Sequence, residues 1–95
     1  MAGISKTVVS LHPGKIEEVS KFIDSRSNLV TEIDGMIGLA VAVTGEDEIT
    51  IIGVYESSKA AQAASDTVQK VFYDMASLMT SSPDRGVYSG VWFSK

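Results

Sequence analysis

The hydrophobic positions of the chain follow two periods, and each change of period marks the boundary of a predicted element. Residues 4–11 (ISKTVVSL) are rich in β-branched side chains and are followed by Pro13 and Gly14, which is typical of a strand and its end. From Ile16 the apolar residues recur at helical spacing. This pattern predicts a helix that has ended by Gly35, a residue suited to a left-handed terminating position.

The second half of the chain has the same order of strand, helix and strand. Residues 36–44 (MIGLAVAVT) and 49–56 (ITIIGVYE) predict two strands, and the short polar turn between them favours an antiparallel hairpin. Apolar residues at three- and four-residue steps predict one helix over residues 58–79. The segment TSSPDRG interrupts this pattern, and VYSGVWFS predicts a final strand over residues 87–94.

The predicted order β-α-β-β-α-β defines an α+β fold of the ferredoxin-like type. Right-handed crossovers give one four-stranded antiparallel sheet with both helices on one face. A length of 95 residues fits one domain, so we expect residues 1–95 to form a single unit.

The predicted strands are apolar on both faces, although two helices cover only one face. Leu39 and Val41 oppose Ala40 on the second strand, and Ile51 opposes Ile52 on the third. The second face exceeds the apolar patch that monomers usually expose, so we predict a homodimer formed through this face. The alternative is an ordinary surface, made semi-polar by residues such as Ser10, Thr44 and Ser89.

Composition and charge exclude several classes of function. Twelve acidic and eight basic side chains give a net charge of −4, and the basic residues are scattered, which argues against a nucleic-acid partner. The absence of cysteine excludes disulfides and thiolate metal sites. No apolar run is long enough to span a membrane and the start lacks a signal-peptide pattern, so we expect a cytoplasmic protein with no membrane partner.

Few residues suggest chemistry. His12, the only histidine, lies where the first strand ends and is a candidate for proton transfer, although a histidine at a strand end is more often an ordinary loop residue. Gly14-Lys15 lacks the remaining residues of a phosphate-binding loop. Neither a second histidine nor carboxylates at ligand spacing are present, so no metal or other cofactor is expected.

Aromatic residues are the other candidates, and we take Tyr55, Tyr88 and Trp92 as candidate substrate-binding residues. On the predicted final strand Tyr88 and Trp92 share one face with Gly90 between them, which leaves room for a flat ligand. Aromatic packing in a core or a dimer interface explains the same pattern.

Four segments together resemble one known family. PGKIEEV after the first strand, IDGMIGLAV at the second, VYESSKAAQAA at the second helix and YSGVWF near the end are similar to antibiotic biosynthesis monooxygenase-like proteins of the dimeric α/β barrel superfamily. The resemblance covers roughly residues 4–93. It implies a ferredoxin-like fold whose copies pack sheet against sheet into a barrel.

The resemblance also implies possible activities. Some relatives oxygenate polycyclic aromatic compounds without a metal or flavin, and some degrade haem. The haem-degrading relatives use an asparagine on the first strand with a tryptophan and a histidine near the second helix. This chain has Ser5, Thr7 and Ser10 on the first strand and neither of the other two residues in the second helix, so that activity is disfavoured. Two readings stay open: a cofactor-independent monooxygenase acting on an aromatic or quinone-type molecule, and a non-catalytic dimeric protein that is structural or binds a small apolar ligand.

Overall fold

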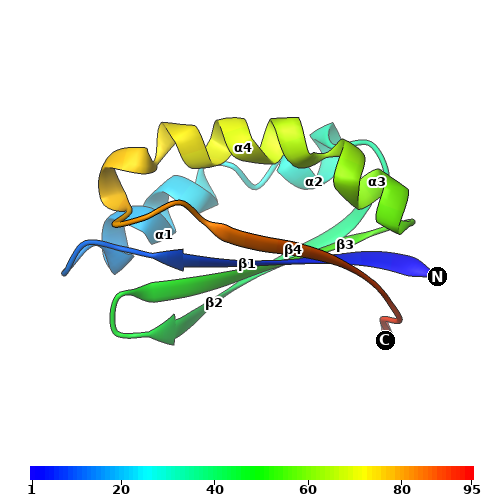
Figure 1. The fold of residues 1–95 in the computed structure, drawn as a ribbon, viewed down its shortest axis with the longest axis horizontal. Coiled ribbons are helices and arrows are strands. Elements are labelled where there is room, and N and C mark those ends of the chain that lie inside the picture. Colours follow the sequence, from blue (N-terminus) through cyan, green and yellow to red (C-terminus); the bar gives the residue numbers. More distant parts are fainter.

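The computed structural model describes residues 1–95, and its centre is one four-stranded antiparallel sheet in the order β2-β3-β1-β4. All helices lie on one face of this sheet, and its other face is uncovered (Figure 1). The ferredoxin-like α+β arrangement predicted from the sequence is therefore confirmed. The elements are β1 (Ala2–Ser10), α1 (Ile16–Asp24), α2 (Leu29–Glu32), β2 (Met36–Gly45), β3 (Glu48–Tyr55), α3 (Ser58–Ala63), α4 (Ser65–Asp74), a 3₁₀ turn (Ala76–Leu78) and β4 (Asp84–Gly90).

Both predicted helices are shorter than expected. The first is divided into α1 and α2 by a turn in which Ser25 Oγ donates a hydrogen bond to the Phe22 carbonyl at 2.5 Å. Serine side chains compete in this way with the helical hydrogen bonds of the backbone. The second predicted helix is divided into α3 and α4 at Ala64, and α4 ends at Asp74 rather than Met79, because Met75 leaves the helical conformation with φ −108° and ψ 14°.

The prediction of a final strand over residues 87–94 was wrong in its position. β4 pairs only with β1, and the last pair joins Gly90 to Ala2 at the start of β1. Residues beyond Gly90 therefore have no strand to pair with, and residues 91–95 leave the sheet on the side away from the helices (Figure 1). The sequence predicted that Tyr88 and Trp92 share one face of the final strand. This prediction was wrong, because β4 ends at Gly90 and Trp92 lies beyond it.

The core lies between the sheet and the helices and consists of two clusters. Strand residues alternate strictly in β1, where Ser5, Thr7 and Val9 are buried under the helices while Lys6 is exposed on the uncovered face. The first cluster is Val9, Leu11, Val19, Ile49, Phe72 and Met75, and the second is Ile33, Tyr55, Ala61 and Ala64.

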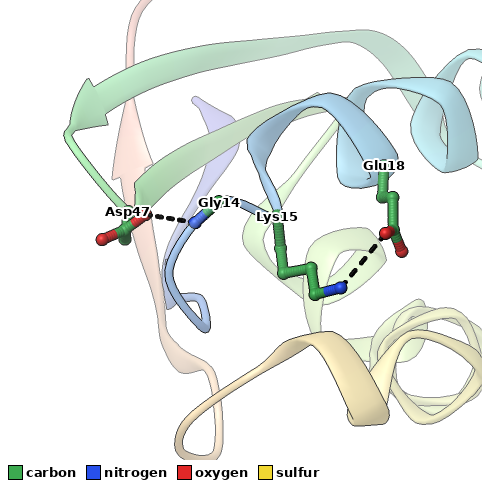
Figure 2. A network of polar contacts seen from close by, with 4 residues as sticks. All are labelled: Gly14, Lys15, Glu18 and Asp47. Atoms are coloured by element: carbon green, nitrogen blue, oxygen red, sulfur yellow. Dashed lines mark hydrogen bonds and ion pairs between the residues drawn. The ribbon is translucent and has the colours of Figure 1, made fainter.

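The hairpin between β2 and β3 holds the junction of β1 and α1 in place. Asp47 accepts a hydrogen bond from the backbone N–H of Gly14 at 3.2 Å through Oδ1, and its carbonyl accepts one from Leu11 at 2.8 Å (Figure 2). Gly14 has φ +77°, and Lys15 pairs with Glu18 in the first turn of α1 at 3.2 Å. The histidine-proline-glycine segment is thus a strand-to-helix connection tied down by an acidic turn.

Candidate functional site

A cavity of about 340 Å³ lies between the helices and the sheet, and we call it the inner cavity. Most of the residues around it are hydrophobic and come from β1, β2, β3, α1, α2 and α4. Leu39 and Val41 of β2 line it together with Phe72 of α4 and Met75, the residue that follows α4. Pockets of this size and apolar character are typical of small-molecule sites.

Three hydroxyl groups border the inner cavity from the sheet. Ser5 and Thr7 of β1 and Tyr55 of β3 are almost completely buried, with Tyr55 only 1% exposed. None of the side-chain hydrogen bonds of the chain involves these hydroxyls. Each hydroxyl can both donate and accept a hydrogen bond, so the sheet presents unused polar groups to a mostly apolar cavity.

Gly53 makes room for the ring of Tyr55. A Cβ atom at Gly53 would lie 3.0 Å from Cε1 of Tyr55 and 2.7 Å from Oγ of Ser5. Real Cβ atoms essentially never show the shorter distance and rarely show the longer one, so the glycine permits the tyrosine to lie back along β3 beside Ser5.

Arg85 of β4 places a positive charge at the boundary of the inner cavity. Its Nη1 donates to Ser65 Oγ at 3.0 Å, and its Nη2 donates to the Ala61 carbonyl at 3.1 Å. Its Nε is the only buried side-chain nitrogen or oxygen of the chain without a hydrogen-bond partner. A buried N–H without an acceptor costs about 1–3 kcal/mol, so the position of this guanidinium is held by its two Nη contacts against an unfavourable Nε.

Charged residues also border the cavity at the end of α1. Arg26 pairs with Asp74 of α4 at 2.9 Å, and its guanidinium lies 5.0 Å from the centre of the Phe22 ring. These contacts join the ends of two helices. Asp24 is the only carboxylate that borders the cavity, and it forms no ion pair.

A second, more polar cavity of about 490 Å³ lies between α4 and the segment that leads into β4, and we call it the outer groove. Phe72 and Arg85 border both the inner cavity and the outer groove. The other lining residues are Gln69, Tyr73, Ala76, Met79, Thr80, Ser81, Ser82 and Pro83.

The structure does not bring the four candidate residues of the sequence together. Tyr55 borders the inner cavity, whereas Tyr88 lies on the uncovered face of the sheet with 58% of its surface exposed. Trp92 lies beyond β4 and is 39% exposed. His12 is exposed at the end of β1 and borders neither cavity. In the monomer only the position of Tyr55 fits a role at the inner cavity.

Ser5, Thr7 and Arg85 are site residues that the sequence did not single out. Ser5 and Thr7 lie at alternate positions of β1, on the face that the helices cover, and this spacing relative to Val9 could have indicated them. Arg85 carried no local signal, because its partners lie 20 and 24 residues away. No group of three or more histidine, aspartate or glutamate side chains converges as a metal site, and none of the helices is long and apolar enough to span a membrane.

Neither protein-family models nor curated protein sequences match the chain. Solved structures do match it. A protein of unknown function from Nitrosomonas europaea superposes with a TM-score of 0.83 at 14% identity, covering 99% of this chain and 93% of the other. A candidate antibiotic biosynthesis monooxygenase from the same organism gives 0.77 at 14% identity, with coverage of 96% and 91%.

A variant of SnoaB, a cofactor-independent oxygenase from Streptomyces nogalater, superposes with a TM-score of 0.75 at 9% identity, covering 97% of this chain and 95% of its own. At such low identities the similarity concerns the fold. The chain has the fold of the antibiotic biosynthesis monooxygenase-like proteins, which confirms the fold that the sequence motifs predicted.

Proposed function

We propose that this chain is a single-domain, homodimeric, cofactor-independent monooxygenase that binds a flat, apolar, oxygen-bearing aromatic molecule in the inner cavity. The observation that carries the proposal is an apolar cavity bordered by the hydroxyls of Ser5, Thr7 and Tyr55, which form no hydrogen bond within the chain, and by the Arg85 side chain. The fold shared with a cofactor-independent oxygenase supports the reaction type.

The inner cavity suits a ring system with few polar atoms. Its apolar walls favour a planar hydrocarbon skeleton, since removing apolar surface from water drives binding. The hydroxyls of Ser5, Thr7 and Tyr55 lie on the sheet side and supply hydrogen bonds to carbonyl or hydroxyl groups of the ligand.

Arg85 would stabilise the charge that develops during the reaction. When a CH₂ group that is conjugated with a carbonyl through aromatic rings loses a proton, the negative charge spreads onto the carbonyl oxygen. A donor already fixed at that oxygen stabilises the anion without having to reorganise. The Nη contacts to Ala61 and Ser65 fix the guanidinium, so its positive charge stands at the boundary of the cavity before the anion forms.

The proposed reaction balances without an external reductant. The CH₂ group of an anthrone-type substrate loses one proton, and the resulting carbanion transfers electrons to O₂ and forms a C–O bond. Loss of the second proton and cleavage of the O–O bond leave a ketone and one molecule of water. The substrate supplies all four electrons, and we assign the proton-accepting role to Asp24, the only carboxylate that borders the cavity.

The uncovered face of the sheet supports the proposed homodimer. Its apolar residues come from three strands and include Ile4, Val8, Ile52, Val54 and Tyr88. Small residues of β2, such as Ala40 and Ala42, lie on the same face and allow a close approach. A second copy packed on this face would remove these side chains from water.

A non-catalytic ligand-binding protein is the second candidate. The observation in its favour is that no histidine borders the inner cavity and that His12 lies outside it. Proton transfer by His12 and ligand contacts by Tyr88 and Trp92 stay predictions, which would require a second copy to extend the site toward them.

Oxygen uptake with anthrone as the substrate tests the proposed function. We expect protein-dependent uptake of one O₂ per anthraquinone formed, above the spontaneous rate measured without protein. The variant Tyr55→Phe should lower the rate, because it removes one hydroxyl from the site. The variant His12→Ala tests the predicted proton transfer by His12, which a loss of activity would support. Full activity of His12→Ala would reject that role.

Binding without turnover would overturn the oxygenase and favour the second candidate. A shift in melting temperature with anthraquinone, measured beside the oxygen uptake, separates the two. Absence of both binding and turnover would overturn the inner cavity as the functional site.

A further inference from the structure

We infer that Lys6 of each copy in the proposed homodimer forms an ion pair with Asp84 of the other copy, and that these two ion pairs select one arrangement of the two sheets. The inference rests on the homodimer that is part of the proposed function. It names the two residues that make the uncovered face of the sheet specific for a second copy of this chain.

Lys6 places a positive charge in the middle of the uncovered face. Along β1 it lies between Ile4 and Val8, and its partners in the sheet are Ile52 of β3 and Gly86 of β4. Lys6 is exposed and takes part in no ion pair. A homodimer formed through this face would enclose the ammonium group, and a buried charge without an opposite charge beside it is strongly destabilising. The second copy therefore has to supply a carboxylate.

Asp84 provides an unused negative charge on the same face. It begins β4 and is paired with Val8 of β1, which shares the uncovered face with Lys6. Asp84 is exposed, and none of the ion pairs or side-chain hydrogen bonds of the chain involves it. Its carboxylate is thus free to accept the ammonium group of a second copy.

Glu48 is the only other carboxylate within a strand on this face, and it is less suited to the role. It already accepts a hydrogen bond from Thr44 Oγ1 at 2.6 Å. It is also paired with Ser10, at the end of β1 and four residues from Lys6. Asp84 is therefore the carboxylate that is both unoccupied and close to the centre of the face.

Two-fold symmetry turns the closeness of Lys6 and Asp84 on one chain into two contacts between chains. Lys6 is paired with Gly86 and Val8 with Asp84, so Lys6 and Asp84 are diagonal neighbours on adjacent strands. Such neighbours lie about 7–8 Å apart. A two-fold axis that runs between them in the plane of the interface places Lys6 of each copy opposite Asp84 of the other. One symmetric arrangement thus satisfies both charges of both copies.

The apolar residues of the face cannot select this arrangement by themselves. Ile4, Val8 and Ile52 gain from being removed from water, but this gain does not depend on direction, so many orientations of the two sheets bury them about equally. In the other orientations Lys6 would meet an apolar side chain or a second ammonium group. Charge complementarity gives specificity of this kind, and wrong pairings are penalised by several kcal/mol.

Reversal of each charge tests the inference by sedimentation. Lys6→Glu would place two carboxylates opposite each other twice in the dimer, and Asp84→Lys would do the same with two ammonium groups. We expect each variant alone to sediment as a monomer of 10.1 kDa at a concentration at which the parent chain is a dimer. Both positions are exposed, so the variants should fold, and urea unfolding checks this.

An equal mixture of the two variants should form a heterodimer. Both contacts between the two different chains then join opposite charges, whereas each chain carries like charges at its own two positions. A contact within one chain therefore cannot cause the recovery. The matched controls Lys59→Glu and Asp66→Lys make the same charge changes at exposed positions of α3 and α4, on the helical side of the sheet, and each should stay dimeric (Figure 1).

The outcomes separate the ion pairs from the homodimer itself. A dimeric parent chain whose Lys6→Glu or Asp84→Lys variant is still dimeric, or whose two variants stay monomeric when mixed, would overturn the inference and leave the proposed homodimer standing. A monomeric parent chain would overturn both, and Lys6 would then be an ordinary charge on an open sheet.

Discussion

Arg85 of β4 donates a hydrogen bond from Nη2 to the carbonyl of Ala61 in α3 at 3.1 Å. The bond crosses from the edge strand of the sheet to the helical layer and ties the guanidinium to a backbone atom. Its partner bond to Ser65 Oγ, at 3.0 Å, reaches the first residue of α4. The charge is therefore held by two helices at the wall of the inner cavity, while Nε is left without an acceptor.

Replacing Arg85 should weaken ligand binding more than it weakens the fold. The variant Arg85→Met keeps an apolar stem but removes the positive charge at the cavity boundary, and interactions with a charged group contribute about 1.5–3 kcal/mol. We expect the affinity for 1,8-dihydroxyanthraquinone to fall by about 10- to 100-fold. Fluorescence titration measures the affinity, and urea unfolding checks the fold.

The control for this prediction is Lys70→Met. Lys70 is exposed on α4 and takes part in no ion pair, so its loss changes the net charge equally without touching the cavity. Equal affinities of Arg85→Met and Lys70→Met would contradict the role of Arg85.

Gly53→Ala should destabilise the protein and disturb Tyr55. The new methyl group would meet Ser5 Oγ at 2.7 Å and the Tyr55 ring at 3.0 Å, and overpacking of this kind costs about 1–3 kcal/mol. Gly38→Ala is the matched control, because nothing lies within 4 Å of a Cβ there. Urea unfolding should leave Gly38→Ala at or above the stability of the parent chain; a similar loss in both variants would contradict the packing argument.

Gly35→Ala and Gly14→Ala separate backbone strain from a steric clash. Both glycines have positive φ, +79° at Gly35 and +77° at Gly14, so either substitution should cost about 1 kcal/mol through the backbone. Only at Gly35 would the new Cβ meet a neighbour, Ala60 Cβ at 2.9 Å. We expect Gly35→Ala to cost about 2 kcal/mol more than Gly14→Ala in urea unfolding, the difference being the overpacking of α3 against the start of β2.

The order of elements was predictable because it depends on local periodicity. The β-branched residues of 4–11 and the helical spacing after Ile16 are properties of neighbouring residues, and the structure follows them. The end of β4 was not predictable in this way. VYSGVWFS is a good local strand pattern, but pairing stops at Gly90 because β1 begins at Ala2. The end of β4 therefore depends on the pairing of Gly90 with Ala2, two residues that lie near opposite ends of the sequence.

The site shows the same division between local and long-range information. Tyr55 was selected as a candidate from its residue type. It lies on the face of β3 that the helices cover, where it is almost completely buried. The role proposed for Arg85 depends on its hydrogen-bond acceptors in α3 and α4 and on an Nε that has no hydrogen-bond partner. Neither property can be recognised in the segment TSSPDRG. Residue type alone selected His12, which the fold leaves in a loop.

The proposed homodimer predicts the mass of the protein in solution and its response to one charge. Sedimentation at micromolar concentration should give a species of twice 10.1 kDa. Tyr88→Glu should produce monomers, because two-fold symmetry would bury the unpaired carboxylate twice within the interface. Tyr73→Glu is the matched control, since Tyr73 is 81% exposed on α4, on the opposite side of the sheet, and should leave the dimer intact. A single 10.1 kDa species for the parent chain would refute the dimer, and the uncovered face would then be ordinary surface.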